Sequence, residues 1–178
     1  PTRANDPGEG CPATVYEIKQ GLLDSGLDVA LSGLQVTAVN EHGFFAQIPS
    51  DDRDSVLGAS YSGLWTYSPT GADFTPPAVG SRVSYQATIN EFYGQWQVTD
   101  VRSMTIDATG LADPSPEQGT IVQLATGGAL ADPFEGLLVT SADAEVPSHN
   151  PLAEIGDEDP TGEFLLDDTL RVNDFLYT

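Results

Sequence analysis

The sequence predicts an all-β protein, with a five-stranded barrel at residues 13–106 and a partial second β module at residues 134–178. Three observations support this fold class. Apolar and polar residues alternate in short segments between residues 28 and 101, as they do in half-buried strands. Glycine-containing turns separate these segments, and a motif near residue 33 returns near residue 136.

The first hairpin is predicted at residues 28–48. Alternation in its first strand shifts phase at Gly33, which indicates a β-bulge. The turn at residues 40–43 ends with Gly43, a residue suited to positive φ, and a returning strand follows at residues 44–48. These two strands open the predicted barrel.

Three further strands complete the barrel. The third is predicted at residues 64–67, after an irregular polar stretch, and a proline-rich loop follows it. Residues 83–89 and 96–101 form a second hairpin around the turn at Tyr93 and Gly94. Five strands in this order, with one long loop before the fourth, fit a small Greek-key barrel of the OB type.

The segments that flank the barrel carry weaker patterns. Residues 1–12 are rich in proline and glycine and are predicted to be a flexible tail. Residues 14–20 are compatible with either a short strand or one helical turn. Residues 107–133 are predicted to be a connector with one short helix or strand.

The second module is predicted from a repeat that stops early. Four residues recur with unchanged spacing: Gly33, Leu34, Val36 and Thr37 return as Gly136, Leu137, Val139 and Thr140. Residues 162–166 and 170–177 echo the second and third strands, but nothing echoes the last hairpin. We therefore expect an incomplete barrel whose open edge lies beside Leu137, Val139 and Phe164. The missing strand would come from residues 13–20 or from a neighbouring molecule.

Composition and charge limit the classes of partner. The chain has 27 acidic and six basic residues, a net charge of −21, and 39% apolar residues, enough to fill a core. This strongly negative charge favours cationic partners and disfavours nucleic acid, because nucleic-acid binding relies on Lys and Arg. Cys11 is the single cysteine, so no intrachain disulfide is expected.

The ends and hydropathy of the chain suggest where it works. It begins at Pro1, shows no charged-then-apolar signal sequence, and has no apolar run long enough to span a membrane. We expect a processed chain that is secreted, extracellular or at the cell surface. Scarce lysine with abundant Asp, Thr, Ser and Gly suits this location.

No pattern predicts catalysis. His42 and His149 lack spaced partners for metal binding or acid–base chemistry, and the chain has neither a nucleophile elbow nor a phosphate-binding glycine loop. We therefore expect no enzyme activity and no required cofactor. Acidic loops could hold Ca²⁺, and the best candidate is the cluster Asp157, Glu158 and Asp159. The alternative is that these carboxylates only keep the protein soluble.

Aromatic residues are the other candidates for a site. Bases and sugars stack on exposed rings, and Trp65, Tyr93 and Trp96 are candidates for such a platform. The competing explanation is that these rings fill the barrel, since a small barrel needs large side chains inside.

A family resemblance rests on the turn glycines and aromatic residues of residues 15–21, 33–39, 43–47 and 90–94. These segments resemble OB-fold-like modules of bacterial secreted proteins, often found beside extracellular nuclease domains. Residues 134–139, 162–164 and 167–174 look like the opening of a second such module. The resemblance implies a nucleic-acid-binding accessory role, which the acidic charge does not favour.

Two functions follow from the sequence. The first is a non-catalytic structural or interaction protein that self-associates by strand completion into an oligomer or filament. The alternative is a nucleic-acid- or polysaccharide-binding accessory module of a larger secreted, nuclease-like protein.

Overall fold

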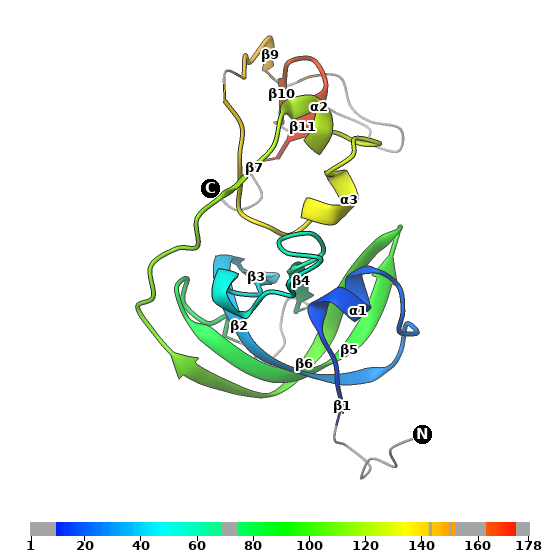
Figure 1. The fold of residues 1–178 in the computed structure, drawn as a ribbon, viewed down its shortest axis with the longest axis vertical. Coiled ribbons are helices and arrows are strands. Elements are labelled where there is room, and N and C mark those ends of the chain that lie inside the picture. The colour runs from blue at the N-terminus through cyan, green and yellow to red at the C-terminus, as the bar shows by residue number, and fades with distance from the viewer. Residues whose placement is uncertain (1–9, 69–74, 143, 150, 152–162, 174–178) are drawn as a thin grey trace.

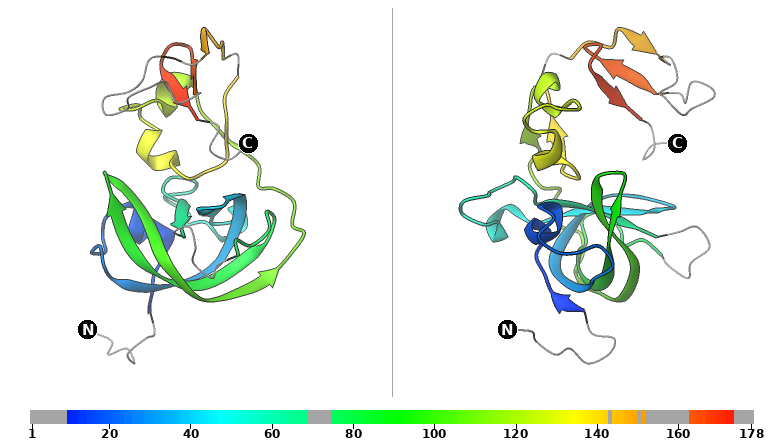
Figure 2. Two further views of the ribbon diagram at one scale, coloured as in Figure 1. Left: turned by 180° about the vertical axis from the view of Figure 1, so that it is seen from behind. Right: turned by 90° about the vertical axis from the view of Figure 1, so that its right-hand side faces the viewer.

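The computed structural model describes residues 10–68, 75–142, 144–149, 151 and 163–173. Strands predominate and the helices are short, which confirms the all-β class. Figures 1 and 2 show a barrel at one end of the molecule and a smaller C-terminal region at the other.

Five strands close into a ring. They are β2 (Asp28–Asn40), β3 (Gly43–Gln47), β4 (Gly63–Tyr67), β5 (Arg82–Phe92) and β6 (Gln95–Ala108). The order is β2-β3-β4-β6-β5, and β5 pairs back to β2. The β4–β6 pairing is parallel and the others are antiparallel. The predicted five strands therefore form a barrel that needs no further strand.

The length and bend of β2 allow this closure. Its register with β5 shifts between Leu31 and Leu34, where Gly33 has a φ of 69°. Residues 28–35 pair with β5 across this shift, and residues 35–40 pair with β3. The bulge predicted at Gly33 is confirmed, and it lies two residues before Gln35, where β2 pairs with both β5 and β3.

Alternation along the strands places one face in the core. Val36, Phe44, Leu64 and Val98 are fully buried there. Tyr85 also lies inside the barrel, where its hydroxyl is 2.7 Å from Thr66 Oγ1. Burial raises the pKa of the Tyr85 phenol well above its ordinary value.

Two turns depend on positive φ. Gly43 has a φ of 145°, and a Cβ there would lie 2.0 Å from the Thr66 carbonyl oxygen of β4. The predicted turn of the β5–β6 hairpin has φ of 51° at Tyr93 and 90° at Gly94. Two successive positive φ values are the requirement of a type I′ hairpin turn.

The N-terminal elements pack on this barrel. Cys11 and Pro12, predicted to lie in the flexible tail, form β1 (Cys11–Pro12), which pairs in parallel with β2. The open choice at residues 14–20 is resolved as α1 (Val15–Lys19), which begins with a capping box between Thr14 and Glu17. Residues 15–19 are helical, so this segment does not supply the extended strand predicted for the second module.

The connections contain short ordered pieces. The 3-10 helix η1 (Ser50–Asp52) follows β3. The predicted connector contains β7 (Glu117–Gln118), α2 (Ile121–Leu124) and the start of α3 (Ala131–Phe134). It therefore holds more ordered elements than the one predicted.

The C-terminal region does not repeat the barrel in its described residues. It contains β8 (Val139–Thr140), β9 (Ser148–His149), β10 (Phe164–Leu166) and β11 (Leu170–Val172). The predicted strands near residues 164 and 170 form the antiparallel pair β10–β11, and β9 pairs with the other edge of β10. However, β8 pairs in parallel with β7 and not with β10, so the β2–β3 hairpin has no counterpart among the residues described after 134.

The reason is that the residues before β8 contact the barrel. Glu135 forms an ion pair with Lys19 of α1, and the Leu138 amide donates to Gln47 Oε1 of β3 at 3.2 Å. The backbones of Gly136 and Gly63 meet so closely that a Cβ on Gly63 would lie 2.4 Å from the Gly136 carbonyl carbon. Only Val139 and Thr140 then remain as a strand. Among the described residues, no helix has the length and apolar content to span a membrane.

Candidate ligand-binding groove

An aromatic groove lies on the outer face of the barrel. Because Phe44, Leu64 and Val98 point inward, their strand neighbours Phe45, Trp65 and Gln97 point outward. The groove has a volume of about 630 Å³. Its lining residues are His42, Phe45, Trp65, Tyr67, Asn90, Phe92, Gln95, Gln97 and Thr99.

Aromatic rings form the apolar part of the groove. Phe45 and Trp65 are directly opposite each other on β3 and β4, with ring centroids 4.5 Å apart. Trp65 is only 7% exposed, so it serves as a wall and not as a projecting platform. Phe92 comes from the β5–β6 hairpin, is 55% exposed, and meets the Tyr93 ring edge-on at 4.6 Å.

Polar side chains form the rest of the lining, and they include His42, whose Nε2 lies 3.4 Å from Glu41 Oε1. Asn90 of β5 is the register partner of Gln97 on β6, so two amide side chains lie next to each other. Phe92 and Gln95 are likewise register partners across the same hairpin. None of the nine lining residues is Asp, Glu, Lys or Arg, although the chain carries a net charge of −21.

This combination of side chains is suited to binding. Rings provide flat apolar surface, and amides both donate and accept hydrogen bonds. A pocket of about 300–1,000 Å³ with mainly apolar walls and a few polar groups is the usual form of a small-molecule site. The groove can therefore hold a ligand that has a flat apolar face and polar edges.

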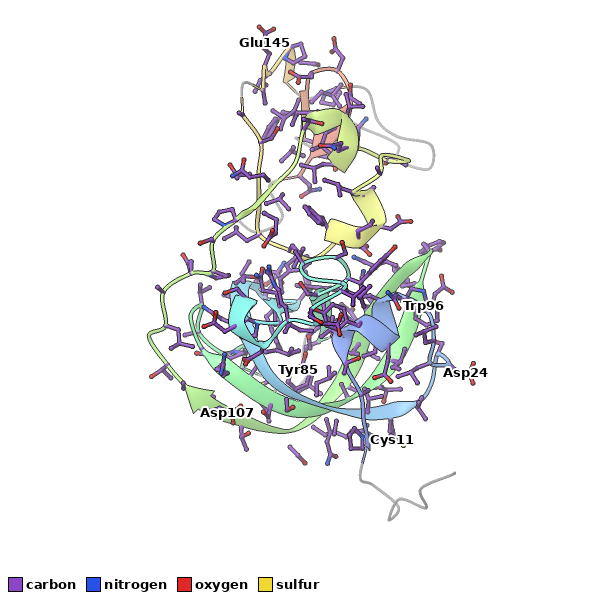
Figure 3. All side chains as sticks on the ribbon, viewed as in Figure 1. Cys11, Asp24, Tyr85, Trp96, Asp107 and Glu145 are labelled. Atoms are coloured by element: carbon purple, nitrogen blue, oxygen red, sulfur yellow. The ribbon has the colours of Figure 1, made fainter. Side chains whose placement is uncertain are left out.

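The structure separates the three predicted stacking residues. Trp65 lines the groove, whereas Tyr93 is 95% exposed at the hairpin tip and only contacts Phe92. Trp96 lies beside α1 (Figure 3), where a Cβ on Gly21 would be 3.1 Å from its ring. It lines a separate polar cleft with Lys19. Of the three candidates, Trp65 lines the groove, and its role in stacking stays a prediction.

Phe45 and the groove amides were not predicted as part of a site. Their signal is indirect: Phe45, Asn90 and Gln97 each lie next to a buried apolar residue in an alternating strand, and alternation places them on the outer face. Knowing which outward residues meet requires the strand register, in which Phe45 faces Trp65 and Asn90 faces Gln97. Alternation alone does not give that register.

The remaining predicted site residues lie elsewhere. The predicted calcium ligands Asp157, Glu158 and Asp159 are outside the described residues. Within the part of the chain that the structure describes, no three or more His, Cys, Asp or Glu side chains converge as a metal site requires.

The predicted assembly edge is not a single edge in the described structure. Leu137 lies against the backbone of Gly63 on β4, and Val139 belongs to β8. Phe164 lies in β10, which has a strand on each side. The three residues therefore belong to three different environments.

Comparisons with known proteins do not identify a family. No family model, no curated protein and no solved structure matches the chain.

Proposed function

We propose that this protein is a non-catalytic binding module with a barrel of the OB type, and that the groove holds a ligand by stacking against its aromatic rings. The observation that carries the proposal is the position of the groove. OB-type barrels bind oligonucleotides and oligosaccharides on their second and third strands, between the loops that join strands 1–2 and 4–5.

The groove has this position in the barrel. Phe45 and Trp65 belong to β3 and β4, the second and third strands of the ring. His42 comes from the turn between the first two strands, and Phe92 and Gln95 flank the turn between the last two. This agreement in position and in side-chain chemistry supports the proposal.

Self-association by strand completion remains a prediction. The barrel ring is closed without a donor strand, and β10 has a partner on each side, so the described residues give this function no support. Secretion and calcium binding also remain predictions.

Alanine variants of groove residues test the proposal. Isothermal titration calorimetry against neutral oligosaccharides and a dT oligonucleotide at low salt should find a ligand for the native protein. Phe92→Ala and Tyr67→Ala should each weaken binding about tenfold or more, because stacking contributes about 1–3 kcal/mol per ring. Val56→Ala is the matched control, since Val56 is 89% exposed and does not line the groove.

The result must be specific to the groove. Circular dichroism should show unchanged folding of the three variants. Equal binding by Phe92→Ala, Tyr67→Ala and Val56→Ala would move the ligand out of the groove and contradict the proposal.

A further inference from the structure

We infer that the ligand of the groove is an uncharged oligosaccharide and not a nucleic acid. This inference rests on the proposed function, because it names the class of molecule that the same groove takes. Three observations carry it: the pairing of the basic residues, a groove lining without Asp, Glu, Lys or Arg, and its mixture of rings and amides.

The basic side chains of the described residues are committed to carboxylates. The five ion pairs are Lys19–Glu135, Arg53–Glu117, Arg82–Asp52, Arg102–Asp28 and Arg171–Glu163. None of the five basic residues lines the groove. A phosphate backbone gains most of its affinity from Lys and Arg, so the described part of the chain offers little to a nucleic acid.

The net charge opposes a polyanion as well. With −21 on the chain, a strand of phosphates approaches against a repulsive field that only salt can screen. An uncharged ligand experiences no such repulsion. The same electrostatic repulsion disfavours oligosaccharides of uronic acids, which carry a carboxylate on each ring.

The lining matches what a neutral sugar presents. A sugar hydroxyl both donates and accepts, as do the side-chain amides of Asn90, Gln95 and Gln97. One face of a pyranose ring carries mainly C–H groups, and these pack against the negative face of an aromatic ring such as Phe92. The amides can therefore hydrogen-bond the sugar hydroxyls and the rings can pack against its C–H face, and neither contact requires a charge.

The volume is compatible with a short oligosaccharide. About 630 Å³ lies within the range of about 300–1,000 Å³ that small-molecule sites occupy. The walls come from four barrel strands and the β2–β3 turn, so the ligand lies across strands that packing holds rigid.

A ligand panel tests the class. Calorimetry on the native chain would use four neutral series, namely cello-, xylo-, malto- and N-acetylglucosamine oligomers. A uronic-acid oligomer of matched length and a dT oligonucleotide would be the anionic probes, at low and at high salt. We expect at least one neutral series to bind with an affinity independent of salt, and neither anionic probe to bind.

Two variants connect that binding to the groove. Gln95→Ala removes an amide of the lining and should lower affinity for the neutral sugar about fivefold or more. Gln86→Ala is its matched control, because Gln86 also lies on a barrel strand but does not line the groove. Circular dichroism confirms that both variants fold.

The outcomes separate this inference from the proposed function. Oligonucleotide or uronic-acid binding that is lost in Phe92→Ala would overturn the inference and leave the binding groove in place. If the folded protein bound none of the probes, both the inference and the proposed function would be overturned. Neutral-sugar binding that falls in Gln95→Ala and not in Gln86→Ala supports both.

Discussion

The barrel and the C-terminal region contain the same short motif, which begins at Gly33 and again at Gly136, in different surroundings. Gly33 and Gly136 both have positive φ, 69° and 81° respectively. Around Gly33 there is nothing within 4 Å of an added Cβ, whereas at Gly136 that atom would lie 2.9 Å from the Gly63 carbonyl carbon. The motif therefore specifies a local backbone conformation, and the surroundings decide whether that conformation bends a strand or fits against another chain segment.

The two regions also differ in the interactions that stabilise them. Barrel strands run for five to 14 residues and pair around a closed ring, whereas β7 to β11 have two or three residues each. The C-terminal region joins the barrel through the Lys19–Glu135 and Arg53–Glu117 ion pairs. We expect the C-terminal region to depend on these contacts more than the barrel does.

The largest expected effect comes from breaking the Lys19–Glu135 ion pair, in which the lysine is buried and the glutamate is partly exposed. The Lys19 side chain is 3% exposed, so Glu135→Gln leaves a buried ammonium without its carboxylate. We expect a loss of about 3 kcal/mol in the free energy of unfolding, measured by urea denaturation. Limited proteolysis should also begin near residues 126–140 before the barrel is cut.

An exposed pair provides the control. Arg82–Asp52 has side chains that are 35% and 54% exposed, so Asp52→Asn should cost less than about 1 kcal/mol. The double variant Lys19→Met with Glu135→Leu should recover most of the stability, because it removes both charges. Equal small losses in Glu135→Gln and Asp52→Asn would mean that the C-terminal region does not depend on this contact.

A smaller loss of stability is expected from alanine at the first glycine of each copy of the motif, and it should differ between Gly33 and Gly136. Alanine at a positive φ costs about 1–2 kcal/mol through its Cβ, and Gly33→Ala should show only this strain. Gly136→Ala adds the collision with Gly63, so we expect it to lose about 1 kcal/mol more. Urea midpoints of the two variants measure the difference, and identical midpoints would show that the glycine contact does not hold the regions together.

Sequence patterns predict the barrel well because its signals are local. Alternation identified the five strands, and Gly33 and the Tyr93–Gly94 turn marked the bulge and the hairpin. The helix at Val15–Lys19 was left open, although Thr14 and Glu17 have the spacing of a capping box. Five residues are too few to show a helical period.

The C-terminal region and the groove depend on contacts that are distant in sequence. Nothing near Gly136 indicates that the Gly63 backbone faces it, and the repeat therefore predicted a strand where the chain contacts the barrel. The groove likewise brings Phe45 of one hairpin close to Phe92 of the other. Alternation assigns each of these residues to an outer face. Only the closure of the strands into a ring brings Phe45 and Phe92 close together.

The smallest expected effect is an acid response of the barrel. Asp28 Oδ1 accepts hydrogen bonds from Arg102 Nη2 and Thr88 Oγ1, both at 2.7 Å, and so links β2 to β5 and β6. The bond from Arg102 first, and then that from Thr88, lower the pKa of Asp28 below its ordinary 3.8. The resulting stability is present above pH 3.8 and is lost as pH falls through the folded-state pKa.

The urea midpoint should therefore fall less steeply for Asp28→Asn than for the native protein between about pH 5 and pH 2, where aspartates titrate. Because the pair is exposed, salt should reduce the effect. Asp24→Asn, which removes an exposed aspartate close to Asp28 in the chain, is the matched comparison for the loss of one carboxylate. Amide exchange should place the acid response in β2, β5 and β6. An equal response in β10 and β11 would mean that the two regions unfold as one unit and that the barrel is not independent.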